Sequence, residues 1–79
     1  MLLPVDDLLG KVYEMNLYTG NTISGHVVFT VQEVDPETDT VIAVDNHTLQ
    51  RQTLSHQMLS DAVWAGKDVW ESALPPYGG

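Results

Sequence analysis

The chain of 79 residues lacks cysteine, has few basic residues and contains no long apolar run. Without cysteine, no disulfide can reinforce the thin core of so short a domain. A bound metal or a partner subunit is the remaining supplement for a domain of this size. The absence of cysteine is typical of a cytoplasmic protein, which is the location we expect.

The apolar residues are also too dispersed for a membrane protein. A membrane-spanning helix needs a run of about 18 apolar residues or more, and the sequence contains none. The first residues, MLLPVDDLL, are acidic where a signal peptide would be basic. We therefore expect no membrane contact and no export.

Basic residues are the scarcest charged type, with three Lys and Arg against eleven Asp and Glu, for a net charge of −8. Nucleic-acid binding draws most of its affinity from basic side chains that neutralise phosphates. Lys11, Arg51 and Lys67 cannot build a broad basic face. The acidic excess serves solubility, or it forms a surface directed at a basic protein, with cation binding as a further option.

Residue patterns of catalytic and metal sites are absent as well. There is no cysteine nucleophile, no clear Ser-His-Asp arrangement and no glycine-rich phosphate loop. Acidic pairs such as Asp6-Asp7 fall at a helix start or in a turn, where acids are common. The three histidines are scattered, without a His-x-His or His-x₃-His pair. We expect a protein that is not an enzyme and that has no cofactor and no metal site.

The residues that are present predict one short helix and five strands. Pro4, two acids and Gly10 predict a helix over residues 4–9. Alternating and β-branched residues then predict strands. These strands are expected over residues 11–18, 22–34, 40–44, 48–54 and 62–64, with a tight half-turn over 55–61 before the last one.

Two glycines have positions that explain how such strands are arranged. Gly20 lies in a Thr-Gly-Asn turn, where a positive φ is needed. Gly25 lies inside the long strand, where glycine marks a bend or a bulge. A long bent strand lets one sheet fold over on itself. The sequence therefore predicts an all-β fold with a short N-terminal helix, in the form of a five-stranded, strongly bent small barrel.

Residues 15–25, MNLYTGNTISG, carry a resemblance to the Sm and Sm-like proteins, a family that includes bacterial Hfq. They follow the spacing of apolar residues and two glycines in the first motif of that family. Residues 54–63, LSHQMLSDAV, resemble the Hfq segment that opens the turn into the last strand. The resemblance covers roughly residues 5–64. It implies an Sm-like (SH3-like) barrel over residues 1–64 and a tail over 65–79, in which KDVWESAL can form a short helix.

The resemblance also implies self-assembly into a ring of roughly five to seven subunits. In such rings the fourth strand of one subunit pairs with the fifth strand of the next, which enlarges the core and removes free strand edges. Arg51 is then expected to pair with an acid of the neighbouring subunit. The residues expected at this interface are Leu49, Arg51, Thr53, Ala62, Val63 and Trp64.

An RNA site is the second implication of the resemblance. An Asp and an Asn four positions later help to form the base pocket of the family, and Asp35 and Asp39 have that spacing here. Ser55-His56 corresponds to the Lys-His pair of Hfq. The expected RNA contacts are therefore Asp35, Asp39, Ser55 and His56. However, a carboxylate replaces the amide at Asp39, a serine replaces the lysine, and no aromatic residue stands in that loop to stack a base. His56 either faces a pore and contacts a ribose or satisfies backbone groups of the turn.

Two functions remain open from the sequence. The first is a non-catalytic Sm-like ring, an RNA-chaperone-like scaffold whose single-stranded RNA binding is weak or lost. The second is an acidic interaction module that binds or inhibits a basic, nucleic-acid-processing protein. Acidic Sm-like inhibitors of the transcription terminator Rho are a precedent for it. Trp64 and Trp70 near the tail form a contact surface or pack within the subunit.

Overall fold

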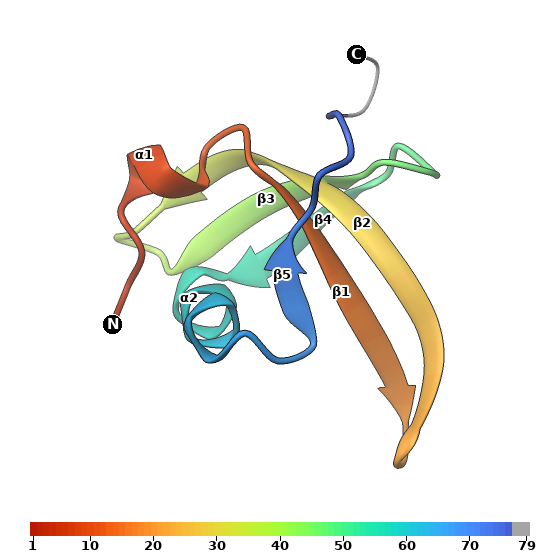
Figure 1. Cartoon of the computed structure of the whole chain (residues 1–79). Helices are drawn as coiled ribbons and strands as arrows, with labels where there is room; N and C mark the ends of the chain where they lie inside the picture. The colour runs from red at the N-terminus through yellow and green to blue at the C-terminus, as the bar shows by residue number, and fades with distance from the viewer. Residues whose placement is uncertain (77–79) are drawn as a thin grey trace.

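A five-stranded antiparallel sheet and two helices form the fold in the computed structural model, which describes residues 1–76 (Figure 1). The strand order is β4-β3-β2-β1-β5, so β4 and β5 are the two edges of the sheet. The prediction of a small, mainly β fold with a short N-terminal helix is confirmed. The elements are α1 (Val5–Leu8), β1 (Val12–Thr19), β2 (Thr22–Asp35), β3 (Thr40–Asp45), β4 (Arg51–Ser55), α2 (His56–Ala65) and β5 (Val69–Glu71).

Strand β2 is the longest strand and curves along the whole sheet (Figure 1). Its pairing register shifts twice, once opposite the step from Leu17 to Tyr18 and once between Val31 and Glu33. Each shift leaves one extra residue in β2, Ser24 and Gln32 respectively. Bulges of this kind bend a strand and increase its twist. They let β2 pair with β1 along its first part and with β3 along its last part.

The concave face of the sheet holds the core, which α1 and α2 cover. Tyr13 of β1 lies opposite Phe29 of β2, and their ring centroids are 5.9 Å apart. Leu8 comes from α1 and Leu59 from α2, and both side chains are buried. Each such side chain contributes about 1.5–3 kcal/mol when it leaves water. The core residues are Leu8, Tyr13, Phe29, Val31, Val41, Ala43, Leu59 and Val69.

The chain differs from the sequence prediction after Ser55. The predicted half-turn over 55–61 and the predicted strand over 62–64 are wrong, because residues 56–65 form helix α2. Ser55 caps the helix by accepting a hydrogen bond from the Met58 N–H, and Gly66 ends it with a φ of 64°. Serine at the N-cap and a left-handed glycine after the last turn are strong helix boundaries.

The last strand lies in the segment that was predicted to be a tail. Residues 69–71 form β5 instead of the expected short helix, and they pair with β1 from Tyr13 to Met15. Beyond β5 the chain crosses the outer face of the sheet. There the Ser72 N–H donates to the Val12 carbonyl, and the Asn46 side chain donates to the Pro75 carbonyl. The rest of the predicted tail, residues 77–79, lies outside the described residues.

Candidate functional site

Three of the four predicted RNA contacts lie together at the start of α2. The two carboxylate oxygens of Asp39 accept hydrogen bonds from the Ser55 hydroxyl at 2.6 Å and from the Gln57 N–H at 2.8 Å. The Asp39 carbonyl accepts from the His56 N–H at 3.2 Å. The Ser55 hydroxyl, followed by the Gln57 N–H, holds the pKa of the Asp39 carboxyl below its usual range. Asp39 therefore fixes the corner between the β2–β3 turn and α2.

His56 faces the inside of the molecule. Its side chain is 2% exposed, and its Nε2 donates to the Leu3 carbonyl at 2.8 Å. Its Nδ1 is buried and has no hydrogen-bond partner among the described residues. Ser60, one turn further along α2, accepts from the Leu3 N–H at 3.0 Å. Two buried side chains of α2 thus hold both backbone groups of Leu3 and fix the first residues of the chain against the helix.

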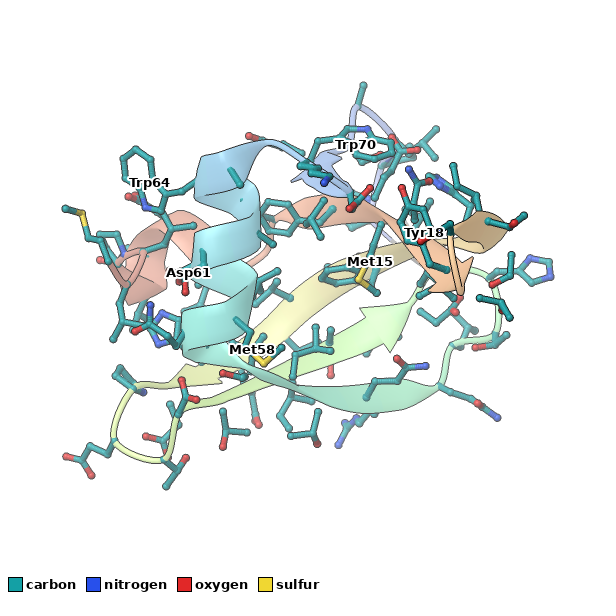
Figure 2. The ribbon with its side chains drawn as sticks, turned by 90° about the horizontal axis from the view of Figure 1, so that it is seen from below. Met15, Tyr18, Met58, Asp61, Trp64 and Trp70 are labelled. Carbon is teal, nitrogen blue, oxygen red and sulfur yellow. The ribbon has the colours of Figure 1, made fainter. Side chains whose placement is uncertain are left out.

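The fourth predicted RNA contact and the predicted interface residues lie apart from this corner. Asp35 ends β2, and one of its oxygens accepts from the Glu37 N–H. Leu49 precedes β4 in a turn with a φ of 62° and is exposed. Arg51 and Thr53 are exposed on edge strand β4. The assignment of 62–64 to an edge strand is wrong, and Trp64 is an exposed residue of α2 (Figure 2).

An apolar groove of about 330 Å³ lies beside α2, between edge strand β4 and the start of β5. Met58 of α2 is 73% exposed and forms one side of it, and Met15 of β1 lies on the opposite side (Figure 2). Methionine side chains adapt to irregular partners. The lining residues are Met15, Thr53, Leu54, Ser55, Met58, Leu59, Ala62 and Val69.

A polar cluster that the sequence analysis missed lies on the outer face of β1, β2 and β5. His26 Nε2 lies 2.8 Å from Glu14 Oε1, and His26 Nδ1 lies 3.1 Å from Asn16 Oδ1. The ring centroids of His26 and Trp70 are 5.7 Å apart. Hydrogen bonding to His26 is the largest cause that holds the pKa of Glu14 below its usual range. The alternation of Glu14 and Asn16, together with the Gly20 turn, could have placed His26 opposite them.

Acidic residues are concentrated at one end of the molecule. Helix α1 lies beside the last part of β2, where the Gly10 N–H donates to the Val31 carbonyl (Figure 1). The acids of α1 and those around the β2–β3 turn therefore share one end. We call these residues the acidic end. Its members are Asp6, Asp7, Glu33, Asp35, Glu37 and Asp39.

The three basic side chains do not neutralise the acidic end. Lys11 Nζ lies 3.2 Å from Glu71 Oε1. Arg51 pairs in register with Val44, at the far end of β3 from the β2–β3 turn. Lys67 lies in the loop between α2 and β5. Lys11, the basic residue that follows α1, is engaged by Glu71, so the six acids of the acidic end give it a negative potential.

Other kinds of site have no support in the part of the chain that the structure describes. Residues 1–76 contain no group of three or more His, Cys, Asp or Glu side chains that could hold a metal ion. None of the helices formed by these residues has the length and apolar character needed to cross a membrane. Comparisons with models of known families, with curated proteins and with solved structures find no match.

Proposed function

We propose that this chain is a non-catalytic interaction module with an Sm-like fold, and that its acidic end binds a basic segment of another protein. The charge distribution is the observation that carries this proposal. The net charge is −8, and six of the eleven acidic residues lie at the acidic end. Opposite charge across an interface steers association and suppresses wrong partners. A basic protein is therefore the class of partner that this surface favours.

The contacts of the predicted RNA residues support a protein partner over RNA. Asp39 and Ser55 hydrogen-bond to each other and to the backbone of α2, and His56 is 2% exposed. Groups used in this way are poorly placed to contact a base or a ribose. Since phosphate contacts supply much of the affinity for nucleic acid, three dispersed basic residues offer little in their place.

Separate binding measurements with a basic peptide and with an RNA strand test this proposal. Fluorescence anisotropy would compare a labelled peptide of alternating Arg and Gly with a labelled oligoadenylate, at about 50 and about 300 mM NaCl. We expect the peptide to bind at low salt and to weaken as salt rises, and the oligoadenylate to bind at neither concentration. Binding of the oligoadenylate without binding of the peptide would overturn the proposal.

Self-assembly into a ring of roughly five to seven subunits is a second candidate function. Edge strands β4 and β5 flank the apolar groove, and an unpaired edge beside an apolar surface favours pairing with another chain. Light scattering on a sizing column gives the mass directly. A mass of five to seven subunits that persists in salt would support the ring. A monomer mass near 8.7 kDa would refute it.

A further inference from the structure

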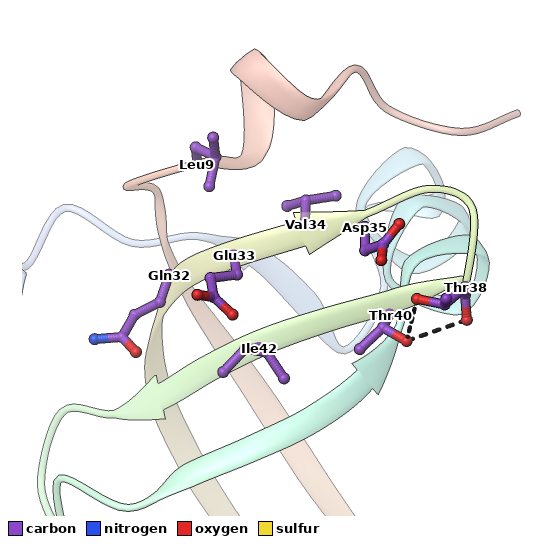
Figure 3. Close-up of a pocket in the computed structure, with 8 residues that line it drawn as sticks. All are labelled: Leu9, Gln32, Glu33, Val34, Asp35, Thr38, Thr40 and Ile42. Carbon is purple, nitrogen blue, oxygen red and sulfur yellow. Dashed lines mark hydrogen bonds between the residues drawn. The ribbon is translucent and has the colours of Figure 1, made fainter.

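An open depression of about 590 Å³ lies at the acidic end, between Leu9 and the paired parts of β2 and β3 next to their turn (Figure 3). Glu33 pairs in register with Ile42, and Asp35 pairs with Thr40. Paired residues of an antiparallel sheet point to the same face, so these four side chains lie together. Leu9, which follows α1, closes one side. We call this depression the β2–β3 groove, and its lining residues are Leu9, Gln32, Glu33, Val34, Asp35, Thr38, Thr40 and Ile42.

The groove combines apolar and acidic surfaces. Leu9 is 42% exposed, and Ile42 is half-buried, so both present aliphatic surface to the groove. The Glu33 side chain is exposed and makes no hydrogen bond or ion pair with any described residue. Asp35 uses one oxygen for the Glu37 N–H at 3.0 Å.

The two threonines of the groove bind each other. The Thr38 hydroxyl donates to the Thr40 hydroxyl at 2.9 Å, which donates in turn to the Thr38 carbonyl at 3.1 Å (Figure 3). Their hydroxyl hydrogens are therefore used inside the turn. The carboxylates of Glu33 and Asp35 remain as the charged groups that can meet a ligand.

We propose that the β2–β3 groove binds an arginine side chain of a basic protein segment, an inference that rests on the proposed function. The aliphatic stem of arginine covers apolar surface while its charged head stays in water, which matches Leu9 and Ile42 beside the acids. Residues two apart on one strand are about 6.6 Å apart. A planar guanidinium with five donors can contact both Glu33 and Asp35 across that spacing, whereas the ammonium of lysine is a single compact charge.

Charge complementarity selects this occupant over an anionic one. Every ionisable side chain that lines the groove is a carboxylate, and the groove lies within the acidic end. A phosphate group would meet only repulsion there. A neutral isostere of arginine, such as citrulline, would keep the stem contacts but lose the charge.

An NMR titration of the uniformly ¹⁵N-labelled chain tests the location and the specificity together. The probes are three short acetylated peptides in which Gly alternates with Arg, with Lys or with citrulline. We expect the Arg peptide to shift the amide signals of the β2–β3 groove. It should bind roughly three- to fivefold more tightly than the Lys peptide, and its advantage in affinity over the citrulline peptide should be larger still. Equal binding of all three peptides would overturn the proposal.

Two charge variants separate the groove from the general acidic surface. Glu33→Gln removes one charge from the groove, and Asp61→Asn removes one exposed charge from α2, outside the groove. We expect Glu33→Gln to weaken the Arg peptide by about fivefold and Asp61→Asn by less than twofold. Equal losses of affinity in the two variants would show that only the overall charge matters, and they would overturn the assignment of the site to the groove.

The outcomes distinguish this inference from the proposed function. If the Arg peptide binds but shifts signals elsewhere on the chain, the groove assignment fails and the proposed function stands. If none of the cationic peptides binds at low salt, both fail. A Leu9→Ala variant gives a second check through the stem contact, with Leu49→Ala as its control at another exposed leucine. A loss of affinity for the Arg peptide in Leu9→Ala alone would support the groove. Equal losses of affinity in both variants would contradict the contact between Leu9 and the arginine stem.

Discussion

Asp39 supports α2 with both oxygens of one carboxylate, and this role makes its charge part of the stability of the fold. Hydrogen bonding keeps its folded-state pKa below the value of about 3.9 that an unfolded Asp has. A carboxyl with a lowered folded pKa stabilises the fold fully above the unfolded pKa. That contribution is lost as pH falls through the folded pKa.

Replacing this carboxylate by an amide should therefore change how stability depends on pH. We expect Asp39→Asn to be less stable than the wild type at about pH 6, and the gap to narrow as pH falls below about 3.9, because the wild type then loses the contribution of its charged carboxyl. Urea unfolding followed by circular dichroism measures both curves. Glu37→Gln is the control, because the Glu37 side chain makes no hydrogen bond or ion pair within the described residues. A gap that stays constant down to pH 2.5 would contradict this role.

The two glycines of the β1–β2 hairpin differ in what their backbone requires. Gly20 has a φ of 62°, in the region that L side chains rarely adopt, whereas Gly25 has no positive φ. A Cβ added at Gly25 would meet Leu17 Cδ1 at 3.5 Å, an ordinary contact. We expect Gly20→Ala to lower the free energy of unfolding by about 1 kcal/mol and Gly25→Ala by less than about 0.5 kcal/mol. Equal losses in urea unfolding would show that the bend itself needs glycine at position 25.

At the scale of elements, α2 joins the first residues of the chain to the sheet. His56 and Ser60 hold Leu3, and the His56 side chain is itself buried. We expect His56→Ala to destabilise the fold by about 2 kcal/mol, because it leaves a cavity and a Leu3 carbonyl without its donor. Thermal unfolding measures the loss, and Gln57→Ala on the exposed face should cost less than about 0.5 kcal/mol.

The same variant separates the two interpretations of His56. If His56→Ala keeps wild-type stability but changes the affinity for oligoadenylate, a ligand-binding role would replace the structural one. If His56→Ala lowers the stability but its folded fraction still binds the Arg peptide, the structural role of His56 holds.

The sequence analysis predicted strands β1 to β3 correctly, but it missed helix α2 and strand β5. Alternation and the turns around Gly20 and Pro36 define β1 to β3 locally. The helix had local signals too, because Ser55 and Gly66 are good caps and the core contacts Leu59, Ala62 and Val63 have helical spacing. The sequence analysis instead assigned residues 55–61 to a half-turn and the short run Ala62-Val63-Trp64 to a strand. Strand β5 is three residues long, too short to show a period, and depends on pairing with β1.

The candidate sites were predictable to a different degree. The corner of Asp39, Ser55 and His56 was expected as a cluster, and the structure brings these residues together. Their hydrogen bonds point inward to α2 and Leu3, which the sequence could not show because the partners are distant in the chain. The β2–β3 groove depends on the bulge at Gln32, which sets the faces of Glu33 and Asp35. A bulge is a tertiary feature and changes the register without a local signal.

At the scale of the whole molecule, a net charge of −8 on a chain with a radius of gyration of 12.0 Å implies self-repulsion in the folded state. We expect the melting temperature to rise by roughly 4–8 °C between about 20 and about 300 mM NaCl, equivalent to about 1 kcal/mol, as screening shortens the range of that repulsion. Differential scanning calorimetry measures the shift. Choline chloride should reproduce it if screening is the cause. A rise with NaCl alone would indicate specific binding of sodium instead.

The strand order also determines when the chain can finish folding. Strands β1, β2 and β3 each pair with the next strand in the sequence, through short turns that close quickly, whereas β5 must return to β1 across most of the chain. During synthesis from the N-terminus the four-strand meander can therefore form while β5 is still inside the ribosome. Until Val69 emerges, the backbone groups of β1 that will pair with β5 remain open to other chains. A strand of three residues thus decides how long the nascent protein is exposed to aggregation.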